Sequence, residues 1–504
     1  MTTNPFVNQT LKPENPAYKA DTVKPLIIAQ GLGAAFTSGN LYELNNNFED
    51  WEALLGAGSQ ACSAVKAFKL VDIYTPLSII PVSDNASGVA ATGSIAFTVS
   101  NPKIGILDII VCDGIFDKYS INVLTTSTAT SIGDELVAKI TANKDSAVTA
   151  SNSSGTVTFT AKNKGTSMNM STILIDGFVS GVTYTITAFS GGATDPVITN
   201  TLDKINEVQY DLIFPKAFLT VVKSHLDAKW NTPDMAIESI GHFDDVDTYA
   251  NITSSLAVNT LNTKTIQKGC VKLANESNHK GASKPVNPLF LTSYRIAINT
   301  LRAFPDSAIE KYMLGGNIRG GVDKLGVPYA NNILYHLPVI RQKNNWTTIE
   351  RKAINDLGGS TYGIDDTGTY TLTEINYMTC FKKATESADG NTYYNLNKVH
   401  TSRYVKAYFQ KRIKKDWAQA GLTNGATPNI PDNKYIDIQG FRNYMSGLYQ
   451  ELGELGIVQP GKLTDFLKSI VLNIDTTTGK ISGSYSFFNM GQFERADFVI
   501  TPKN

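Results

Sequence analysis

The feature that most constrains the fold is an abrupt change in composition at Asn85. From there to Asn200, 14 of 116 residues are charged, about 12% against 18% for the whole chain. Ser, Thr, Gly, Ala and Val dominate this segment, and runs such as residues 94–99 and 184–188 alternate at the two-residue period of a strand. One helix is expected at residues 132–141. The sequence therefore predicts a β-rich domain, residues 85–200, inserted into a chain of another architecture.

On either side of the insert, apolar runs typical of buried strands alternate with helical patterns. Residues 25–30 form one such run, and a helix is expected from Asn47, behind an Asn-rich start. This alternation favours a partly parallel sheet covered on its faces, and hence an α+β multi-domain chain with an α/β-type core at residues 25–84 and 201–480. Further helices are expected at 197–208, 219–230, 289–303, 347–357, 401–420 and 438–455, and strands at 71–81, 210–214, 235–241 and 270–275.

Both ends of the chain have a different character from the core. Residues 1–24 are polar, contain Pro5, Pro13 and Pro16, and have little periodicity. Residues 481–504 contain two strand-like runs, at 484–489 and 496–501, with no obvious partner in their own domain. We expect both ends to be extended arms.

The motifs of common enzymes and cofactor sites are missing from the sequence. The five histidines are scattered, without H-E-x-x-H or H-x-H spacing. The glycine-rich residues 314–326 lack the G-K-[ST] that binds phosphate and Mg²⁺, and no G-x-S-x-G elbow occurs. We therefore expect no catalytic residue and no cofactor, and a protein that is not an enzyme.

A carboxylate-rich run and four cysteines remain as candidate metal ligands. The run from His242 to Asp247 holds three carboxylates, but without EF-hand spacing it is interpreted as a turn or helix cap. The cysteines are isolated and lack C-x-x-C spacing, so the sequence predicts no metal site and buried free thiols.

Charge and hydropathy exclude two further classes of function. The 45 basic and 45 acidic residues balance, whereas a protein that coats nucleic acid is usually basic. No stretch of about 18 apolar residues and no signal peptide is apparent, so we expect neither membrane insertion nor export, and a cytosolic product. A net charge of zero leaves self-association open.

The helix expected at residues 401–420 carries an unusual concentration of positive charge. Between Lys398 and Asp416 there are seven basic residues and one acidic residue, beside an apolar stripe that includes Val405 and Phe409. Three interpretations stay open: an ordinary solvated face, a surface that docks on an acidic partner, and, less favoured, an RNA-binding surface. The basic residues are Lys398, Arg403, Lys406, Lys411, Arg412, Lys414 and Lys415.

Seven passages, in order along about 80% of the chain, carry a resemblance to a known family: 86–98, 157–165, 187–196, 210–213, Leu226-Asp-Ala-Lys-Trp230, 347–359 and 373–425. They resemble the tail sheath protein of contractile-tailed bacteriophages, specifically the Mu-like branch. The passages 86–98 and 157–165 are similar to the module inserted in that family, and residues 226–230 are similar to a segment between its central strands.

The resemblance implies a structural subunit that forms a helical cylinder of stacked rings around an inner tail tube. Contraction of such a cylinder drives the tube through the host envelope during genome delivery. The implied partners are further copies of the chain, the inner tube protein, and baseplate and tail terminator proteins. The implied location is the tail of a virion, assembled in the host cytoplasm.

Under this resemblance, the arms would join subunits by adding strands to neighbouring sheets, and the basic helix, within a tube-proximal region at residues 345–480, would face the tube. The insert would lie outermost. Two alternatives stay open: the sheath of a bacteriocin-like or secretion-type injection machine, and, more remotely, a β-rich adhesin. The predicted arm residues are Pro16, Ala17, Tyr18, Lys19, Ala20, Asp21, Ala496, Asp497, Phe498, Val499, Ile500 and Thr501, and the predicted tube-facing residues are Arg403, Lys406, Lys411 and Lys414.

Overall fold

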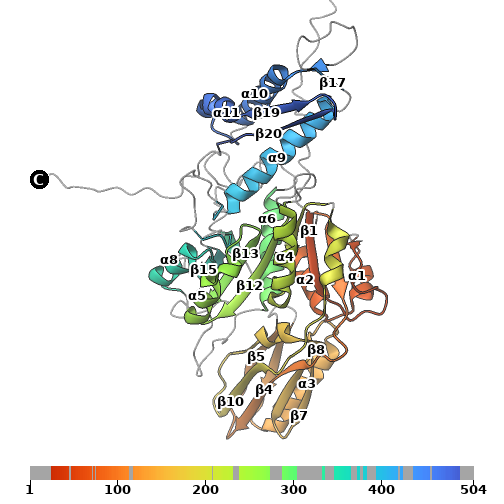
Figure 1. Ribbon diagram of the computed structural model, residues 1–504. Coiled ribbons are helices and arrows are strands. Elements are labelled where there is room, and N and C mark those ends of the chain that lie inside the picture. Colours follow the sequence, from red (N-terminus) through yellow and green to blue (C-terminus); the bar gives the residue numbers. More distant parts are fainter. Residues whose placement is uncertain are drawn as a thin grey trace, which may run out of the picture.

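Three units follow one another along the length of the molecule in the computed structural model (Figure 1). A large sheet with helices on its faces lies in the middle, the insert lies at one end, and a C-terminal unit of helices and a small β-ribbon lies at the other. The structure describes residues 24–44, 47–70, 72–73, 75–112, 117–206, 208–230, 238–272, 287–303, 332–334, 346–364, 372–374, 379–382, 393–394, 396–417, 420–423, 435–454 and 457–488.

Nine of the described strands form the central sheet, and six neighbouring strands in its middle are parallel. This agrees with the partly parallel sheet expected from the alternation of strands and helices. In sheet order the strands are β14 (Asn332–Leu334), β16 (Leu372–Glu374), β15 (Ser360–Ile364), β13 (Ile266–Lys272), β12 (Ile240–Asp247), β11 (Tyr210–Ile213), β1 (Lys24–Gln30), β3 (Leu77–Val82) and β2 (Tyr42–Leu44).

Helices cover both faces of this sheet, which explains why β1 is apolar without interruption. Leu26 and Ile28 pack into the apolar cluster on one face, whereas Ile27 and Ala29 pack into the cluster on the other. The first face is covered by α4 (Leu219–Trp230), α5 (Tyr249–Ala257) and α8 (Thr348–Asp356), and the second by α1 (Phe48–Leu55), α2 (Gln60–Lys69) and α6 (Pro288–Ala303).

The carboxylate-rich run from His242 to Asp247 is part of strand β12 and is buried, so its interpretation as a turn or helix cap was wrong. The strand is stable in the interior because basic side chains neutralise its carboxylates. Asp245 pairs with Lys268 and Lys216, each at 2.8 Å. Asp244 lies 3.6 Å from Arg295 and accepts a hydrogen bond from Thr292.

The insert contains two antiparallel sheets and one helix around a core of its own. The sheets have the orders β10-β4-β8-β7 and β6-β5-β9. Their shared core runs from Ala91 to Phe189 and includes Phe159, Ile121 and Leu136 of the helix. The elements are β4 (Ala90–Val99), β5 (Gly105–Cys112), β6 (Lys118–Val123), α3 (Ala129–Ala142), β7 (Val148–Ser153), β8 (Thr156–Lys164), β9 (Thr172–Asp176) and β10 (Val182–Ser190).

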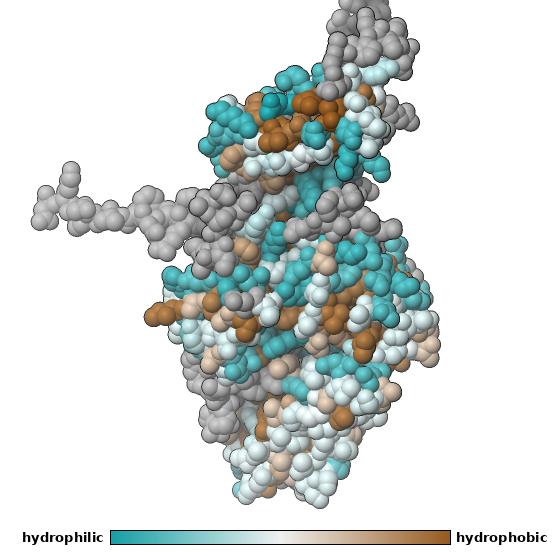
Figure 2. All heavy atoms as spheres, in the orientation of Figure 1, coloured by the Kyte–Doolittle hydropathy of each residue, from teal (hydrophilic) through white to brown (hydrophobic). Residues whose placement is uncertain are grey.

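The outer face of the four-stranded sheet, called here the hydroxyl face, is made almost entirely of Ser and Thr. Thr has a high strand propensity while its hydroxyl stays solvated, so such a face needs no partner to be stable. Figure 2 shows the corresponding pale surface at the insert end. The hydroxyl face consists of Thr92, Ser94, Ala96, Thr98, Thr149, Ser151, Ser153, Thr156, Thr158, Thr160, Thr183, Thr185 and Thr187, and on β8 it ends before Lys162 and Lys164, which follow on the same side of the strand.

The C-terminal unit packs three helices against a two-stranded antiparallel ribbon. Its core includes Phe409, Tyr449 and Phe466, and the Tyr449 and Phe466 rings stack at 4.3 Å between centroids. The elements are α9 (Leu396–Trp417), β17 (Gly421–Leu422), β18 (Tyr435–Ile436), α10 (Ile438–Glu454), α11 (Leu463–Ser469), β19 (Val471–Asp475) and β20 (Lys480–Ser484).

Several boundaries differ from the expectation, and two of the differences have a clear packing reason. The predicted C-terminal arm begins at residue 481, but β20 pairs with β19, and Tyr485 stacks on Phe409 at 5.2 Å, so the C-terminal unit continues to Phe488. The helix expected at residues 197–208 is a shorter 3-10 helix, Thr199–Ile205, which packs Leu202 and Ile205 under the sheet.

Neighbouring residues on β8 provide a direct test of the two faces of the insert. Phe159 is fully buried, so Phe159→Ala should lower the free energy of unfolding by about 3–5 kcal/mol through lost burial and the cavity that remains. Thr158→Val, on the hydroxyl face, should change it by less than about 0.5 kcal/mol. Urea unfolding followed by circular dichroism measures both, and equal losses would contradict the described orientation of the strand.

Candidate assembly surface

The predicted arm segments, from Pro16 to Asp21 and from Ala496 to Thr501, lie outside the described residues. Their role in joining subunits therefore stays a prediction. The basic helix is described, and it can be compared residue by residue with the expectation.

Helix α9 connects the central sheet to the C-terminal unit (Figure 1). At its beginning, Leu396 and Val399 form a small buried cluster with Trp230 and Ile240 of the core. Further along, Val405 and Phe409 enter the core of the C-terminal unit. Through its apolar stripe, α9 therefore packs against the core at its beginning and within the C-terminal unit further along.

Arg403 is buried between α9 and the sheet, and it does not face an open surface as predicted. Only 3% of the residue is exposed, and its Nη1 donates a hydrogen bond of 2.8 Å to Oδ1 of Asp211 on β11. An isolated carboxylate inside a strand requires a cation, and Arg403 supplies it. A lone carboxylate in the apolar run at residues 210–214 indicates that a counter-charge is needed, although it does not identify Arg403 as the partner.

Lys406 also binds within the subunit, although its side chain is 32% exposed. Its Nζ lies 2.8 Å from Oε1 of Glu238, next to the first residues of β12. Lys406 and Arg403 are three residues apart and so lie on the same side of the helix. Both residues attach α9 to the core, and this assignment replaces the predicted tube-facing role for Arg403.

The last turns of α9 present the exposed part of the basic run. Lys411, Lys414 and Lys415 are exposed there, whereas Arg412 binds Glu451 of α10 at 2.9 Å. Positive charge near the carboxyl end of a helix also stabilises the helix dipole, so part of this pattern has a purely local explanation. Lys411 and Lys414 are the two predicted tube-facing residues that lie on an exposed surface.

The β19–β20 ribbon is a candidate assembly surface that was not predicted from the sequence. Its inner side chains, including Leu472 and Ile481, pack on the C-terminal unit, while Val471 is 64% exposed. Among the described residues, no third strand pairs with either edge of this ribbon. In the turn of this hairpin, the Asp475 carboxylate accepts a hydrogen bond and Gly479 has φ +66°. Asp and Gly are typical turn residues, so the hairpin could have been predicted from the sequence.

All four cysteines are buried free thiols, as predicted. Burial raises the pKa of Cys62 to about 11 and that of Cys380 to about 12, so neither is a reactive thiolate at neutral pH. Within the described ranges, no cluster of three or more His, Cys, Asp or Glu side chains is arranged to hold a metal ion, and no helix has both the length and the apolarity to cross a membrane.

Comparison with known proteins agrees with the resemblance predicted from the sequence. The chain is 22% identical over 418 residues to the Mu-like prophage FluMu tail sheath protein of Haemophilus influenzae, covering 81% of this chain and 78% of that protein. A solved structure of the anti-feeding prophage helical sheath in its contracted state gives a TM-score of 0.47 at 10% identity, covering 96% of this chain and 93% of that one. No protein-family model matches the chain. The similarity to a Mu-like tail sheath protein is thus confirmed.

The Arg403–Asp211 pair predicts a large effect on stability. Arg403→Ala removes this cation from a buried carboxylate and should lower the free energy of unfolding by about 3–5 kcal/mol. Lys414→Ala, on the same helix but exposed, should change it by less than about 0.5 kcal/mol. Chemical denaturation of both variants measures the difference, and equal stability would place Arg403 at the surface after all.

Proposed function

We propose that the chain is the sheath subunit of a contractile tail, which polymerises into a helical cylinder around an inner tube and contracts to drive that tube through a host envelope. The observation that carries this proposal is the ordered similarity to a tail sheath protein over most of both chains. The role is structural, and no catalytic step is assigned to any residue.

The arrangement of the three units supports a radial order in the cylinder. The insert and the C-terminal unit lie at opposite ends of the central sheet (Figure 1), so one of them faces inward if the other faces outward. We assign the C-terminal unit to the inside, with Lys411 and Lys414 toward the tube, and the insert to the outside. The uncharged hydroxyl face suits a surface that stays in solvent.

The edges of the β19–β20 ribbon, which pair with no further strand in the described part of the chain, support the proposed joining of subunits by the arms. A strand edge offers a row of backbone donors and acceptors, and an extended segment of another chain can pair with it whatever its sequence. The segments from Pro16 to Asp21 and from Ala496 to Thr501 are the proposed donors, and the ribbon of a neighbouring subunit is the proposed acceptor.

The proposed partners are other copies of the chain, the inner tube protein, and the baseplate and terminator proteins at the two ends of a tail. The proposed location is a virion tail that assembles in the host cytoplasm. Negative-stain microscopy of the purified protein tests the central proposal: striated hollow cylinders are expected, and a protein that stays monomeric at all concentrations would contradict it.

Removal of residues 495–504 tests the arm. The truncated subunits should fold, because they keep every residue of the apolar core of the C-terminal unit, which extends from Val405 to Phe487, but they should fail to form long cylinders. Circular dichroism checks the fold and microscopy checks the assembly. Cylinders of normal length from the truncated chain would refute the role of the C-terminal arm.

Charge reversal on α9 tests the inward orientation. Lys411→Glu with Lys414→Glu should weaken assembly on inner tubes purified from the same tail, and the loss should become smaller at high salt because salt screens exposed charges. Lys103→Glu with Lys352→Glu, two exposed lysines outside the C-terminal unit, changes the net charge equally and is the matched control. Equal sedimentation of both doubles with tubes would exclude an inward-facing α9.

A further inference from the structure

The insert meets the core at a joint built from polar groups. Among the described residues, no apolar cluster spans this joint: the insert core runs from Ala91 to Phe189, and the clusters on the central sheet contain none of these residues. A cavity of about 20 Å³, lined in part by Ala64, Met168 and Phe290, lies where the two units meet. Apolar side chains of both units line this cavity, and hydrogen bonds and ion pairs make up the rest of the joint.

One half of the joint is a set of hydrogen bonds centred on Asp84. Its carboxylate accepts from Gln30 of β1 at 2.7 Å, from the Asn163 side chain at 3.0 Å and from the Lys164 backbone N–H at 2.9 Å. The Asn163 Oδ1 in turn accepts from the backbone N–H of Gln60, the first residue of α2, at 2.9 Å. Two backbone amides, those of Gln60 and Lys164, thus donate to side chains across the joint.

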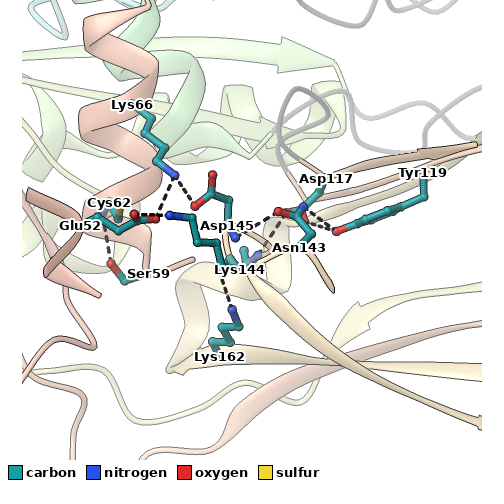
Figure 3. Close-up of polar contacts among 11 residues, drawn as sticks. Glu52, Ser59, Cys62, Lys66, Asp117, Tyr119, Asn143, Lys144, Asp145 and Lys162 are labelled. Carbon is teal, nitrogen blue, oxygen red and sulfur yellow. Dashed lines mark hydrogen bonds and ion pairs between the residues drawn. The ribbon is translucent and has the colours of Figure 1, made fainter. Parts of the chain in front are cut away.

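The other half is a cluster of four charges (Figure 3). Lys66 of α2 is 6% exposed and reaches between Asp145 of the insert, which it contacts directly, and Glu52 of α1 at 3.7 Å. Lys144 of the insert approaches the other Glu52 oxygen at 2.6 Å from an exposed position. Two pairs of opposite charges therefore face each other across the joint, Lys66 with Asp145 and Glu52 with Lys144, and Lys66 is the most buried of the four residues.

Hydrogen bonds within the insert fix the position of Asp145. Asp117, fully buried, accepts hydrogen bonds from the Tyr119 hydroxyl at 2.6 Å and from the Ala147 backbone N–H at 3.1 Å. Asn143 donates to the Tyr119 hydroxyl and accepts from the Asp145 backbone N–H, each at 3.1 Å. These contacts, drawn in Figure 3, fix the turn that points Asp145 at Lys66.

A glycine permits the close approach of the two backbones. Gly58, in the loop between α1 and α2, has φ +74°, and a Cβ atom there would lie 2.1 Å from the Ser146 carbonyl oxygen. Any side chain at this position would push the turn that carries Asp145 away from α2. The charged contact and the glycine therefore depend on the same geometry.

We propose that the joint is an electrostatic latch, in which the charge on Asp145 keeps the insert docked and its loss releases the insert from the core while both units stay folded. The reason is that Lys66 is too buried to lose its nearest carboxylate without penalty. Burial opposes ionisation of Asp145, yet hydrogen bonds to Lys66 and Glu52 and the positive charges of Lys66 and Lys144 hold its pKa below the usual value, so the charged form is the docked one.

Hydrogen exchange of the full chain tests the latch with Asp145→Asn. The amides of Gln60 and Lys164 report docking, and those of β4 report folding of the insert itself. Exchange at the two joint amides should become about tenfold faster, with β4 unchanged. The matched control is Glu135→Gln, which removes an ion pair with Lys139 within α3 and should leave both sets unchanged.

Two further variants separate a latch from a loss of packing. Adding Lys66→Met to Asp145→Asn removes the uncompensated charge and should restore part of the lost protection, whereas a purely structural role predicts a further loss. Gly58→Val should release the joint amides with every charge intact. Unchanged exchange in Asp145→Asn, or equal acceleration in β4, would overturn the proposal.

Discussion

The ion pair between Arg403 and Asp211 ties the C-terminal unit to the rest of the molecule. It joins the first half of α9 to the middle of the central sheet, where both side chains are almost fully buried. The apolar contact nearby is the small cluster of Leu396 and Val399 with Trp230 and Ile240, so the placement of α9 depends strongly on one charged contact. Buried pairs fix geometry well, because a shifted partner leaves a charge in a poor environment.

The same principle recurs at the other end of the molecule. Each of the three units has its own apolar core, and buried charged contacts lie at both junctions between units. The insert joint uses Lys66 and Asp84 in the way that the C-terminal junction uses Arg403 and Asp211. A subunit built in this way combines stable units with precise but breakable junctions, which suits a polymer that passes between two packing arrangements.

The sequence predicted most helices and the β-rich insert because these depend on local periodicity. Asn47, for example, caps α1 where the Asn-rich start indicated, and Thr347 begins α8 with a capping box. The errors arose where a distant residue decides the outcome. The run from His242 to Asp247 looked like a turn until Lys268 and Arg295 supplied its counter-charges, and Arg403 looked solvated until β11 placed Asp211 beneath it. Charge pairing between remote segments leaves no periodic trace in a sequence.

The hydroxyl face has a consequence for how this chain can diverge. Its side chains neither fill a core nor take part in the two junctions, and most exchanges among small polar residues there preserve the strand. Substitutions on this surface should therefore lower the stability of the insert little, whereas most substitutions elsewhere in the insert should lower it more. If this side of the insert points away from the cylinder, the residues on the outer surface of the cylinder are also those that can change fastest in evolution.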